Sequence, residues 1–480
     1  MSLGQELGLD EEKLSTVYYV ALLGSVGCVL DGAVFAEFVR DEIAVREQMV
    51  TLDPSRPLEI AAFFVTRAGA GEAPLRRLTK FLSLARQSQA VCRDVALQVG
   101  GLLDLGPAIK EALGQCDEPW NGKGSVLGLK GDDIHIAARL FILAHDVEVF
   151  QRIGGMDAAM TVVRKRAGKL YDPRIARLFI DIGAKLLSRI EAKSAWDAAM
   201  ASEPQPVRLL SSADFEDVAL KIANFVDMRS PYTVGHSPGV ASRAEGAARA
   251  MGLSTDEASA LRHAGLLHDL GRAGVPVSLW NKTKPLSEEE WERMKRHPAL
   301  TELVLARSDS LSHLGTLAAL HHEKLDGSGY KGLSGASLPV TARILAAADT
   351  YQSKLERRPH REALTPEGAG NELRDQVRQG KLDADVVEAV LAAAGHQPQP
   401  KALPLPAGLS QREVEVLCLA VRGLSNRQIA EALFLSPKTI GRHLESIYSK
   451  IGVSTRVGAT LFALQNGLLQ DALSPILANS

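Results

Sequence analysis

Apolar residues recur along most of this 480-residue chain at the three-to-four-residue spacing of amphipathic helices. Alternating apolar and polar residues, which are typical of strands, are scarce. The pattern therefore predicts an all-α protein. Its clearest runs are Val218, Ile222 and Phe225; Leu373 and Val377; and Val386, Val387, Val390 and Leu391.

The longest uncharged run includes the segment from Val17 to Leu30. It is shorter than the roughly 18 residues that a membrane-spanning helix needs. The residues before it are acidic, where a secretory signal would be basic. We expect a buried core helix in this run and no membrane partner.

Two proline-rich segments, 202–207 and 396–408, divide the chain, because clustered prolines forbid a continuous helix. A chain of this length is expected to form two to four domains. We predict modules at 1–200 and 208–396, a linker at 397–408 and a third module at 409–470.

The first two modules contain an internal repeat. Residues 8–27 fall on 252–271 with an offset of 244, and residues 116–146 fall on 321–350 with an offset of about 204 and one residue missing from the second copy. The repeat predicts one helical fold, duplicated. The first copy begins at the position that matches residue 245, so either the chain starts further upstream or this module is incomplete.

The two copies differ in residues that could bind a metal. Gly24-Ser25 and Cys116-Asp117 of the first copy stand where the second has His268-Asp269 and His321-His322, and His145 stands opposite Asp349. The apolar scaffold persists while these groups are mostly replaced. We interpret the first copy as a retained fold without its chemistry.

The overall charge favours neither nucleic acid nor membrane. Lys and Arg total 55 against 57 Asp and Glu, so any such partner must be bound by a local patch. The four cysteines are too few and too scattered for a disulfide framework, which fits a reducing cytoplasm.

Seven of the 12 histidines lie between residues 236 and 322. Imidazole and carboxylate ligands together suit Fe, Mn or Zn, and the absence of cysteine argues against a structural zinc site. Seven ligands exceed the needs of one ion, whereas two ions about 3.5 to 4 Å apart would use them and promote phosphoryl hydrolysis. The candidate ligands are His236, His268, Asp269, His297, His321, His322 and Asp349.

A single histidine is more often a surface or satisfied core residue than a metal ligand. The adjacent His-Asp and His-His pairs, lost together in the first copy, favour the metal interpretation here. We assign four other histidines to the ordinary class: His263, His313, His360 and His396.

These motifs resemble those of the HD-GYP phosphohydrolases over residues 210–395. The matching segments are GHS at 235–237, HDLG at 268–271, HP at 297–298, HHEKLDGSGY at 321–330 and AAD at 347–349. The resemblance implies an all-α domain that holds two or three Fe or Mn ions and hydrolyses cyclic di-GMP. The first module resembles a degenerate HD domain of the same lineage.

The resemblance also implies residue roles. His236, His268, Asp269 and Asp349 would hold one ion and His297, His321 and His322 the other, with Asp269 bridging both. Asp269 and Arg272 would be catalytic, and the substrate would be contacted by Asp326, Gly327, Gly329, Tyr330 and Arg343. Two alternatives stay open: the 326–330 loop is an ordinary tight turn, and Arg343 is structural, because Arg139 matches it in the first copy.

Several departures from the family pattern concern the substrate rim. The usual HDxGK ends in Arg272, GYP reads Gly329-Tyr330-Lys331, and Gln352 replaces a customary second Asp. Tyr232 stands where a family Glu is associated with a third metal, so we expect two ions.

The C-terminal module carries strong helix signals. Ser410 and Ser425 each begin a capping box that ends in Glu413 or Gln428, and Ser436-Pro437 begins a third helix. In that helix Ile440, Leu444 and Ile447 form an inward stripe, which leaves Lys438, Thr439, Arg442 and Glu445 outside. Residues 409–469 hold seven Lys or Arg against four Glu. The pattern predicts a helix-turn-helix, with a protein-interaction module as the alternative.

The segment LSQREVEVLCLAVRGLSNRQIAEALFLSPKTIGRHLESIYSKIGVSTR resembles the LuxR-type DNA-binding domain. That resemblance implies a four-helix domain that binds double-stranded DNA as a homodimer, often through a last helix at about 454–467. Lys438, Thr439 and Arg442 match positions that approach DNA, and Arg427 and Lys450 match phosphate contacts.

The leading hypothesis is a cytoplasmic transcriptional regulator that couples hydrolysis of cyclic di-GMP, or of a related phosphodiester, to DNA binding. Two alternatives remain at this point. One is a non-catalytic nucleotide sensor, and the other is a phosphohydrolase that acts on another nucleotide.

Overall fold

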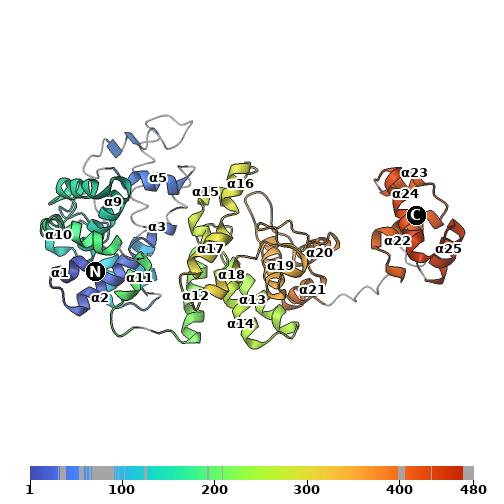
Figure 1. Cartoon of the computed structure of the whole chain (residues 1–480), viewed down its shortest axis with the longest axis horizontal. Coiled ribbons are helices and arrows are strands. Elements are labelled where there is room, and N and C mark those ends of the chain that lie inside the picture. The colour runs from blue at the N-terminus through green and yellow to red at the C-terminus, as the bar shows by residue number, and fades with distance from the viewer. Residues whose placement is uncertain are drawn as a thin grey trace. The chain divides into compact units, whose positions relative to one another are not determined.

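The chain is helical throughout the part that its structure, a computed structural model, describes (Figure 1). Regular secondary structure there consists of α-helices and short 3-10 helices, without strands, so the all-α prediction is confirmed. The description covers the whole chain except residues 31, 33–38, 40, 53–58, 61, 64–65, 67–90, 92, 96, 102, 124–126, 192–193, 208, 398–405, 434, 467 and 469–480.

Two compact units make up the chain, residues 1–397 and residues 398–480. Both copies of the repeat belong to the first unit, so the boundary between modules 1–200 and 208–396 stays a prediction. Most of the predicted linker, residues 398–405, lies outside the described residues.

The second copy packs α13, α14, α19, α20 and α21 around one apolar core, in which Ile344, Leu345, Leu373 and Val390 are fully buried. Many contacts in this core are made by alanines, which let helix axes approach closely. The helices are α12 (Ser212–Asp227), α13 (His236–Ala250), α14 (Thr255–Leu267), η2 (Leu270–Gly274), α15 (Val277–Trp280), α16 (Glu288–Met294), α17 (His297–Leu305), α18 (Ser312–Ala318), η3 (Gly335–Ser337), α19 (Val340–Leu355), α20 (Pro366–Arg378) and α21 (Ala384–Ala393).

The first copy has its own core, which includes Val17, Val20, Leu143 and Tyr171. The buried core helix expected over 17–30 is confirmed for residues 17–23, where Val17 and Val20 are buried, but the described chain turns at residues 24–26 and a second helix follows. The helices that the structure describes here are α1 (Ser2–Glu6), α2 (Glu11–Leu23), α3 (Gly27–Leu30), α5 (Glu42–Met49), α8 (Pro107–Leu113), η1 (Gly131–Asp133), α9 (Ile136–Arg166), α10 (Pro173–Glu191) and α11 (Ala195–Ala201).

Element bounds recur between the copies at the offsets seen in the sequence. Helix α2 coincides with α14 at an offset of 244, and η1 coincides with η3 at 204. The first residue of α9 also corresponds to the first residue of α19 at 204. These coincidences support the duplication independently of residue identity.

A buried glutamate braces the same loop in both copies. The carboxylate of Glu118 accepts hydrogen bonds from the backbone N–H groups of Leu127 and Leu129 at 3.0 Å each. Glu323 does the same for Lys331 and Leu333 at 2.8 and 2.9 Å. A shared buried hydrogen-bond pattern is costly to change, because an unpaired buried group is penalised.

Contacts join the first copy to the second close to the HDLG segment. The Glu42 carboxylate is 1% exposed and accepts from the backbone N–H of Val277 at 2.6 Å. The guanidinium of Arg229 donates from Nε to the carbonyl of Val29 at 3.0 Å and from a terminal nitrogen to the carbonyl of Arg272. The backbone beside the candidate metal ligands is therefore held partly by the first copy.

The C-terminal unit is a small helical domain with its own core, which contains Leu417, Ile429, Ile440 and Ile447. Both predicted capping boxes are present, because the side chains of Ser410 and Glu413, and of Ser425 and Gln428, cap each other's backbone N–H. Its helices are η4 (Pro406–Gly408), α22 (Gln411–Val421), α23 (Asn426–Leu433), α24 (Pro437–Ile451) and α25 (Arg456–Gln465).

The start of η2 is pressed against the start of α17. The backbone N–H of Gly271 donates to the Thr301 hydroxyl at 2.8 Å, and that hydroxyl donates to the carbonyl of His268 at 2.8 Å. A Cβ atom at Gly271 would lie 2.0 Å from the carbonyl oxygen of His297. Only glycine permits this approach, which brings two candidate ligand segments together.

We expect Gly271→Ala to destabilise the 1–397 unit by about 3 kcal/mol or more, because the added methyl meets backbone atoms that cannot move aside. Thermal and urea unfolding of the full chain measure the effect. Gly101→Ala is the matched control, since a Cβ there meets no atom within 4 Å. Equal stability of the two variants would contradict the prediction.

Candidate metal centre and nucleic-acid interface

Five separate segments of the second copy place the seven candidate ligands at one buried point. His236 is the first residue of α13, His297 is the first residue of α17, and Asp349 lies inside α19. The other four follow helix ends: His268 and Asp269 after α14, and His321 and His322 after α18. Of the seven side chains only that of His322 is substantially exposed, at 26%.

Backbone carbonyls fix three of the imidazoles. The Nδ1 atoms of His268, His297 and His321 lie 2.7, 2.7 and 2.6 Å from the carbonyl oxygens of residues 265, 294 and 318. A carbonyl can only accept, so each Nδ1 carries the proton and each Nε2 keeps its lone pair. That is the tautomer that a metal-binding histidine needs.

The two oxygens of Asp269 face two different sets of imidazoles. Oδ1 lies 3.5 Å from Nε2 of His297 and 3.9 Å from Nε2 of His321. Oδ2 lies 3.4 Å from Nε2 of His268 and 3.7 Å from Nε2 of His236. One carboxylate thus stands between both groups.

Asp349 shows the same division. Its Oδ1 is 3.2 Å from Nε2 of His236, and its Oδ2 is 3.5 Å from Nδ1 of His322. The candidate ligands therefore form two groups of three whose ligand atoms lie within 4.8 Å of one another: His297, His321 and His322; and His236, His268 and Asp269.

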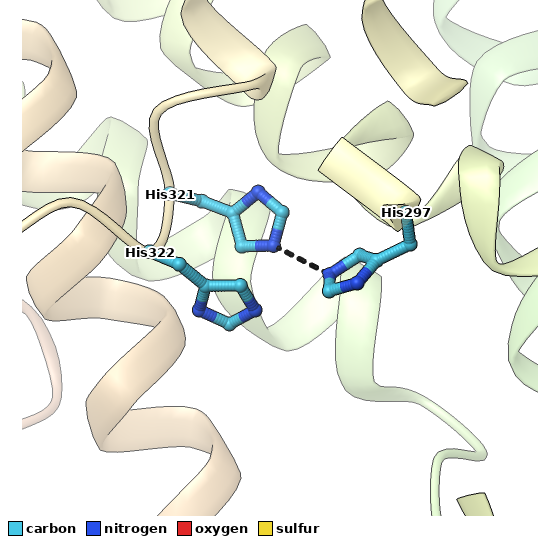
Figure 2. A group of neighbouring side chains, drawn as sticks. All are labelled: His297, His321 and His322. Carbon is cyan, nitrogen blue, oxygen red and sulfur yellow. Dashed lines mark hydrogen bonds between the residues drawn. The ribbon is translucent and has the colours of Figure 1, made fainter. Parts of the chain in front are cut away.

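Figure 2 shows the first of these groups, with the three rings turned toward one another. The Nε2 atoms of His297 and His321 are 3.2 Å apart. Both Nδ1 atoms donate to backbone carbonyls, so the two facing nitrogens are acceptors unless a proton or a cation lies between them. A divalent cation would satisfy both lone pairs.

Burial sets the protonation of these imidazoles. It lowers the pKa of His268, and it lowers the pKa of His297 and of His321 to about 4. Burial alone would also lower the pKa of His236, but hydrogen bonds to Asp349 and Glu356 outweigh it and raise that pKa to about 10. Burial also holds the pKa of His322 well below its usual value. Neutral imidazoles bind metals, so four of the five candidate histidines are already in the binding form at pH 7.

The residues present fit a pair of divalent metal ions. Nε2 of His268 is buried without a hydrogen-bond partner and points into the cluster, where only a ligand would compensate its desolvation. Although burial would raise the pKa of Asp269, Arg272 and the surrounding histidines hold it well below its usual value. A nitrogen-and-carboxylate donor set without cysteine suits catalytic Fe, Mn or Zn.

Arg272 is directed at Asp269. Its guanidinium donates to Oδ2 of Asp269 at 2.7 Å and lies over the Trp280 ring, with Cζ 3.8 Å from the ring centroid. The side chain is buried. Ion pairing and stacking together orient the carboxylate that stands between the two ligand groups.

The loop after the paired histidines lies beside the cluster through one of its members. The Tyr330 ring centroid is 4.4 Å from that of His322. Asp326 is exposed and accepts from the backbone N–H and the hydroxyl of Ser328, which forms a tight turn. Gly327 adopts a φ of +80°, and a Cβ at Gly329 would lie 2.6 Å from Cα of Glu323. Both glycines thus have structural reasons to be there.

The contacts of Arg343 favour the structural alternative. Its guanidinium donates to the carbonyls of Leu338 and Gly335 and to the carboxylate of Asp383. In the first copy Arg139 donates to Asp172 in the same way, at 2.9 Å.

Sequence reasoning missed Glu356, which contacts a candidate ligand. Its carboxylate accepts from Nδ1 of His236 at 3.0 Å, from Nε2 of Gln352 at 2.7 Å and from the guanidinium of Arg358 at 2.6 Å. The signal was its position seven residues after Asp349, two helical turns along the same face. Glu356 supplies a carboxylate close to the position where Gln352 replaces the customary acid.

The first copy has filled the corresponding space with a ring. A Cβ at Gly24, the counterpart of His268, would lie 2.6 Å from the Phe141 ring. A histidine at this position would displace that ring, so the scaffold has closed over the former ligand position.

The predicted DNA contacts lie on α23 and α24. Lys438, Arg442 and Arg427 are exposed, Thr439 is half-buried at the first turn of α24, and Ile440 and Ile447 face the core as expected. Lys450 differs, because its ammonium donates to the buried carboxylate of Glu413 at 2.7 Å. Its contacts favour a role within the domain.

Helix α25 exposes an apolar stripe formed by Val457, Leu461 and Leu464, which are 71%, 55% and 58% exposed. Their spacing places them on one helical face.

Among the helices in the described part of the chain, none combines the length and apolar character needed to cross a bilayer.

Comparison with known families confirms both resemblances. Residues 221–386 match the HD domain family, and residues 407–463 match the family of bacterial regulatory proteins called the luxR family.

Two curated relatives are phosphodiesterases of cyclic dinucleotides. The 3'3'-cGAMP-specific phosphodiesterase 3 of Vibrio cholerae is 28% identical over 376 residues, which cover 76% of this chain and 82% of that protein. The cyclic di-GMP phosphodiesterase of Thermotoga maritima is 34% identical over 186 residues, or 37% of this chain and 50% of that protein.

A crystal structure of a cyclic GMP-AMP specific phosphodiesterase of Vibrio cholerae shares the fold. It superposes with a TM-score of 0.54 at 24% identity, over 82% of this chain and 90% of the other. The match extends well beyond the HD domain, so most of residues 1–397 share the fold of that structure.

We expect Glu356→Gln to weaken metal binding about 10- to 100-fold, because His236 loses the carboxylate that orients its ring. Competition with a chelator, followed by metal analysis of the purified full chain, measures this change. Glu362→Gln is the control, since Glu362 is 82% exposed. Equal metal retention by both variants would refute the role given to Glu356.

Proposed function

We propose that this chain, in which an HD domain precedes a LuxR-family domain, is a metal-dependent phosphodiesterase of cyclic dinucleotides joined to a DNA-binding output. The observation that carries the proposal is the position of Asp269, whose two oxygens face two groups of imidazoles. That arrangement suits two ions bridged by one carboxylate.

His236, His268, Asp269 and Asp349 would hold one ion, and His297, His321 and His322 the other, with Asp269 shared. Fe or Mn would supply the chemistry of activating water and neutralising phosphoryl oxygens in an in-line displacement. The chain's own residues hold the reacting groups in place: backbone carbonyls set the imidazole tautomers, and Arg272 fixes the bridging carboxylate. Burial of the cluster strengthens each of these electrostatic contacts.

The substrate class follows from the relatives, which act on cyclic di-GMP or 3'3'-cGAMP, as their names state. We take one of these two molecules as the substrate of this chain. A non-catalytic nucleotide sensor is the second candidate, favoured by the altered substrate rim at Lys331 and Gln352.

The first test is hydrolysis of both dinucleotides by protein purified without oxygen and analysed for metal. We expect about two Fe or Mn per chain, and at least a 1,000-fold loss of turnover in the His268→Ala/Asp269→Ala variant, because it lacks the bridging ligand. Chromatography of the products measures cleavage.

His313→Ala serves as the control, since His313 is exposed and lies outside the cluster. Bound metal without cleavage of either dinucleotide would reject the proposed reaction and favour the sensor. Cleavage that survives the double substitution would place the reaction elsewhere in the chain.

For the C-terminal unit we propose binding of double-stranded DNA in the cytoplasm as a homodimer. The exposed cations of α24 support the DNA contact, and the apolar stripe of α25 supports a dimer contact. Coupling to the nucleotide requires different nucleotide affinities in two states of the protein. A gel shift that is unchanged by saturating nucleotide would reject that coupling.

We expect Lys438→Ala and Arg442→Ala each to weaken DNA binding about tenfold and to reduce the salt dependence of binding, because each removes a cation from the DNA-facing side. Fluorescence anisotropy at several salt concentrations measures both effects. Arg249→Ala, which removes an exposed cation from the other unit, should change neither. Full affinity of the Lys438→Ala/Arg442→Ala double variant would exclude this face of α24.

A further inference from the structure

A pocket of about 330 Å³ opens beside the candidate metal centre. His322 and Tyr330 contribute to its lining, so it begins at a proposed metal ligand. Lys324 and Ser328 of the same loop also line it, and the remaining lining comes from the α20 region, including Gln376 of α20 and Gln379, the residue that caps this helix. The volume is within the usual range for small-molecule sites.

The two glutamines sit on a rigid turn. The carbonyl of Gln376 accepts from the backbone N–H of Lys381 at 2.9 Å, and Gly380 between them has a φ of +76°. The carbonyl of Lys381 in turn accepts from the N–H of Leu325 at 3.0 Å, which ties the end of α20 to the loop after His321 and His322. The two glutamines thus line the same pocket as His322, on backbone that is tied to the loop after it.

The charge of the lining is positive. Lys324 and Lys381 both contribute to it, and the ammonium of Lys324 donates to the Thr350 hydroxyl at 3.1 Å. Glu372 also lines the pocket; its carboxylate is paired with Lys354 at 3.0 Å and is hydrogen-bonded to the side chain of Gln376. The pocket therefore combines cations for an anion with amides for a planar polar group.

We propose that this pocket binds the nucleotide half of the substrate that is not being cleaved. Gln376 and Gln379 contact the polar edge of its purine, and Lys324 and Lys381 pair with its phosphate. A glutamine amide both donates and accepts, so it matches the paired acceptor and donor groups on the edge of guanine or adenine. This inference rests on the proposed phosphodiesterase function and adds the residues that select the substrate.

The test compares two substrates of the Mn-loaded full chain. A cyclic dinucleotide carries bases, whereas bis(p-nitrophenyl) phosphate is a phosphodiester without one. We expect the Gln376→Leu/Gln379→Leu variant to lower the ratio of kcat/KM for the dinucleotide to kcat/KM for bis(p-nitrophenyl) phosphate about tenfold or more, because hydrogen bonds to the base are lost. The matched control is Asn371→Leu, an exposed amide on the same helix, which should keep the wild-type ratio.

A second variant keeps the test valid if the glutamine double variant does not fold. Lys381→Gln should lower the same ratio and weaken its dependence on salt, because one cation facing the phosphate is removed. Circular dichroism and thermal unfolding establish that each variant is folded.

The outcomes separate this inference from the proposed function. Dinucleotide cleavage with an unchanged ratio in both variants would overturn the pocket and leave the phosphodiesterase standing. If the wild-type chain cleaves no cyclic dinucleotide, the proposed function fails, and calorimetric titration with GMP decides the inference separately. Weaker GMP binding by the glutamine double variant than by the wild-type chain would support the pocket. Equal GMP binding by the two proteins, or no GMP binding by the wild-type chain, would overturn it.

Discussion

A buried carboxylate surrounded by cationic and imidazole groups is the constraint on which the centre of this molecule depends. Asp269 is 4% exposed, and its desolvation would be costly without compensation. Arg272 compensates part of the cost from one side, while imidazoles from three other segments face its two oxygens. Every helix end that carries one of these groups must therefore be placed accurately. The close approach of Gly271 to the backbone of His297 is an example.

The two copies of the repeat separate what the fold needs from what the chemistry needs. Glutamates that brace the loop, at 118 and 323, and arginines that pair with an aspartate, at 139 and 343, persist in both. The full set of candidate ligands occurs only in the second copy, and in the first the Phe141 ring occupies the space beside Gly24. Residues shared by the copies thus belong to the scaffold, whereas residues that differ mark the chemistry.

The sequence predicted the helical fold, the repeat and the ligand cluster, because these depend on local periodicity and on dipeptides such as His268-Asp269 and His321-His322. It missed Glu356 as a partner of His236, since that contact joins residues 120 positions apart. It did not distinguish Lys450 from Lys438 either, because only the packing of α22 brings Glu413 to the Lys450 ammonium. The uncharged run at 17–30 predicts one helix, whereas the structure has two, because the lack of charge does not reveal a turn.

The contacts of Glu42 and Arg229 give the first copy a place in the second copy's architecture. Val277 donates its backbone N–H to Glu42, and Arg229 spans from Val29 to the carbonyl of Arg272. A fragment trimmed to the HD domain would leave a buried cation and a backbone donor without these partners. The first copy is therefore a structural part of the unit that contains the candidate ligands. The bounds of the HD family match do not mark the ends of a fragment that keeps all of its buried contacts.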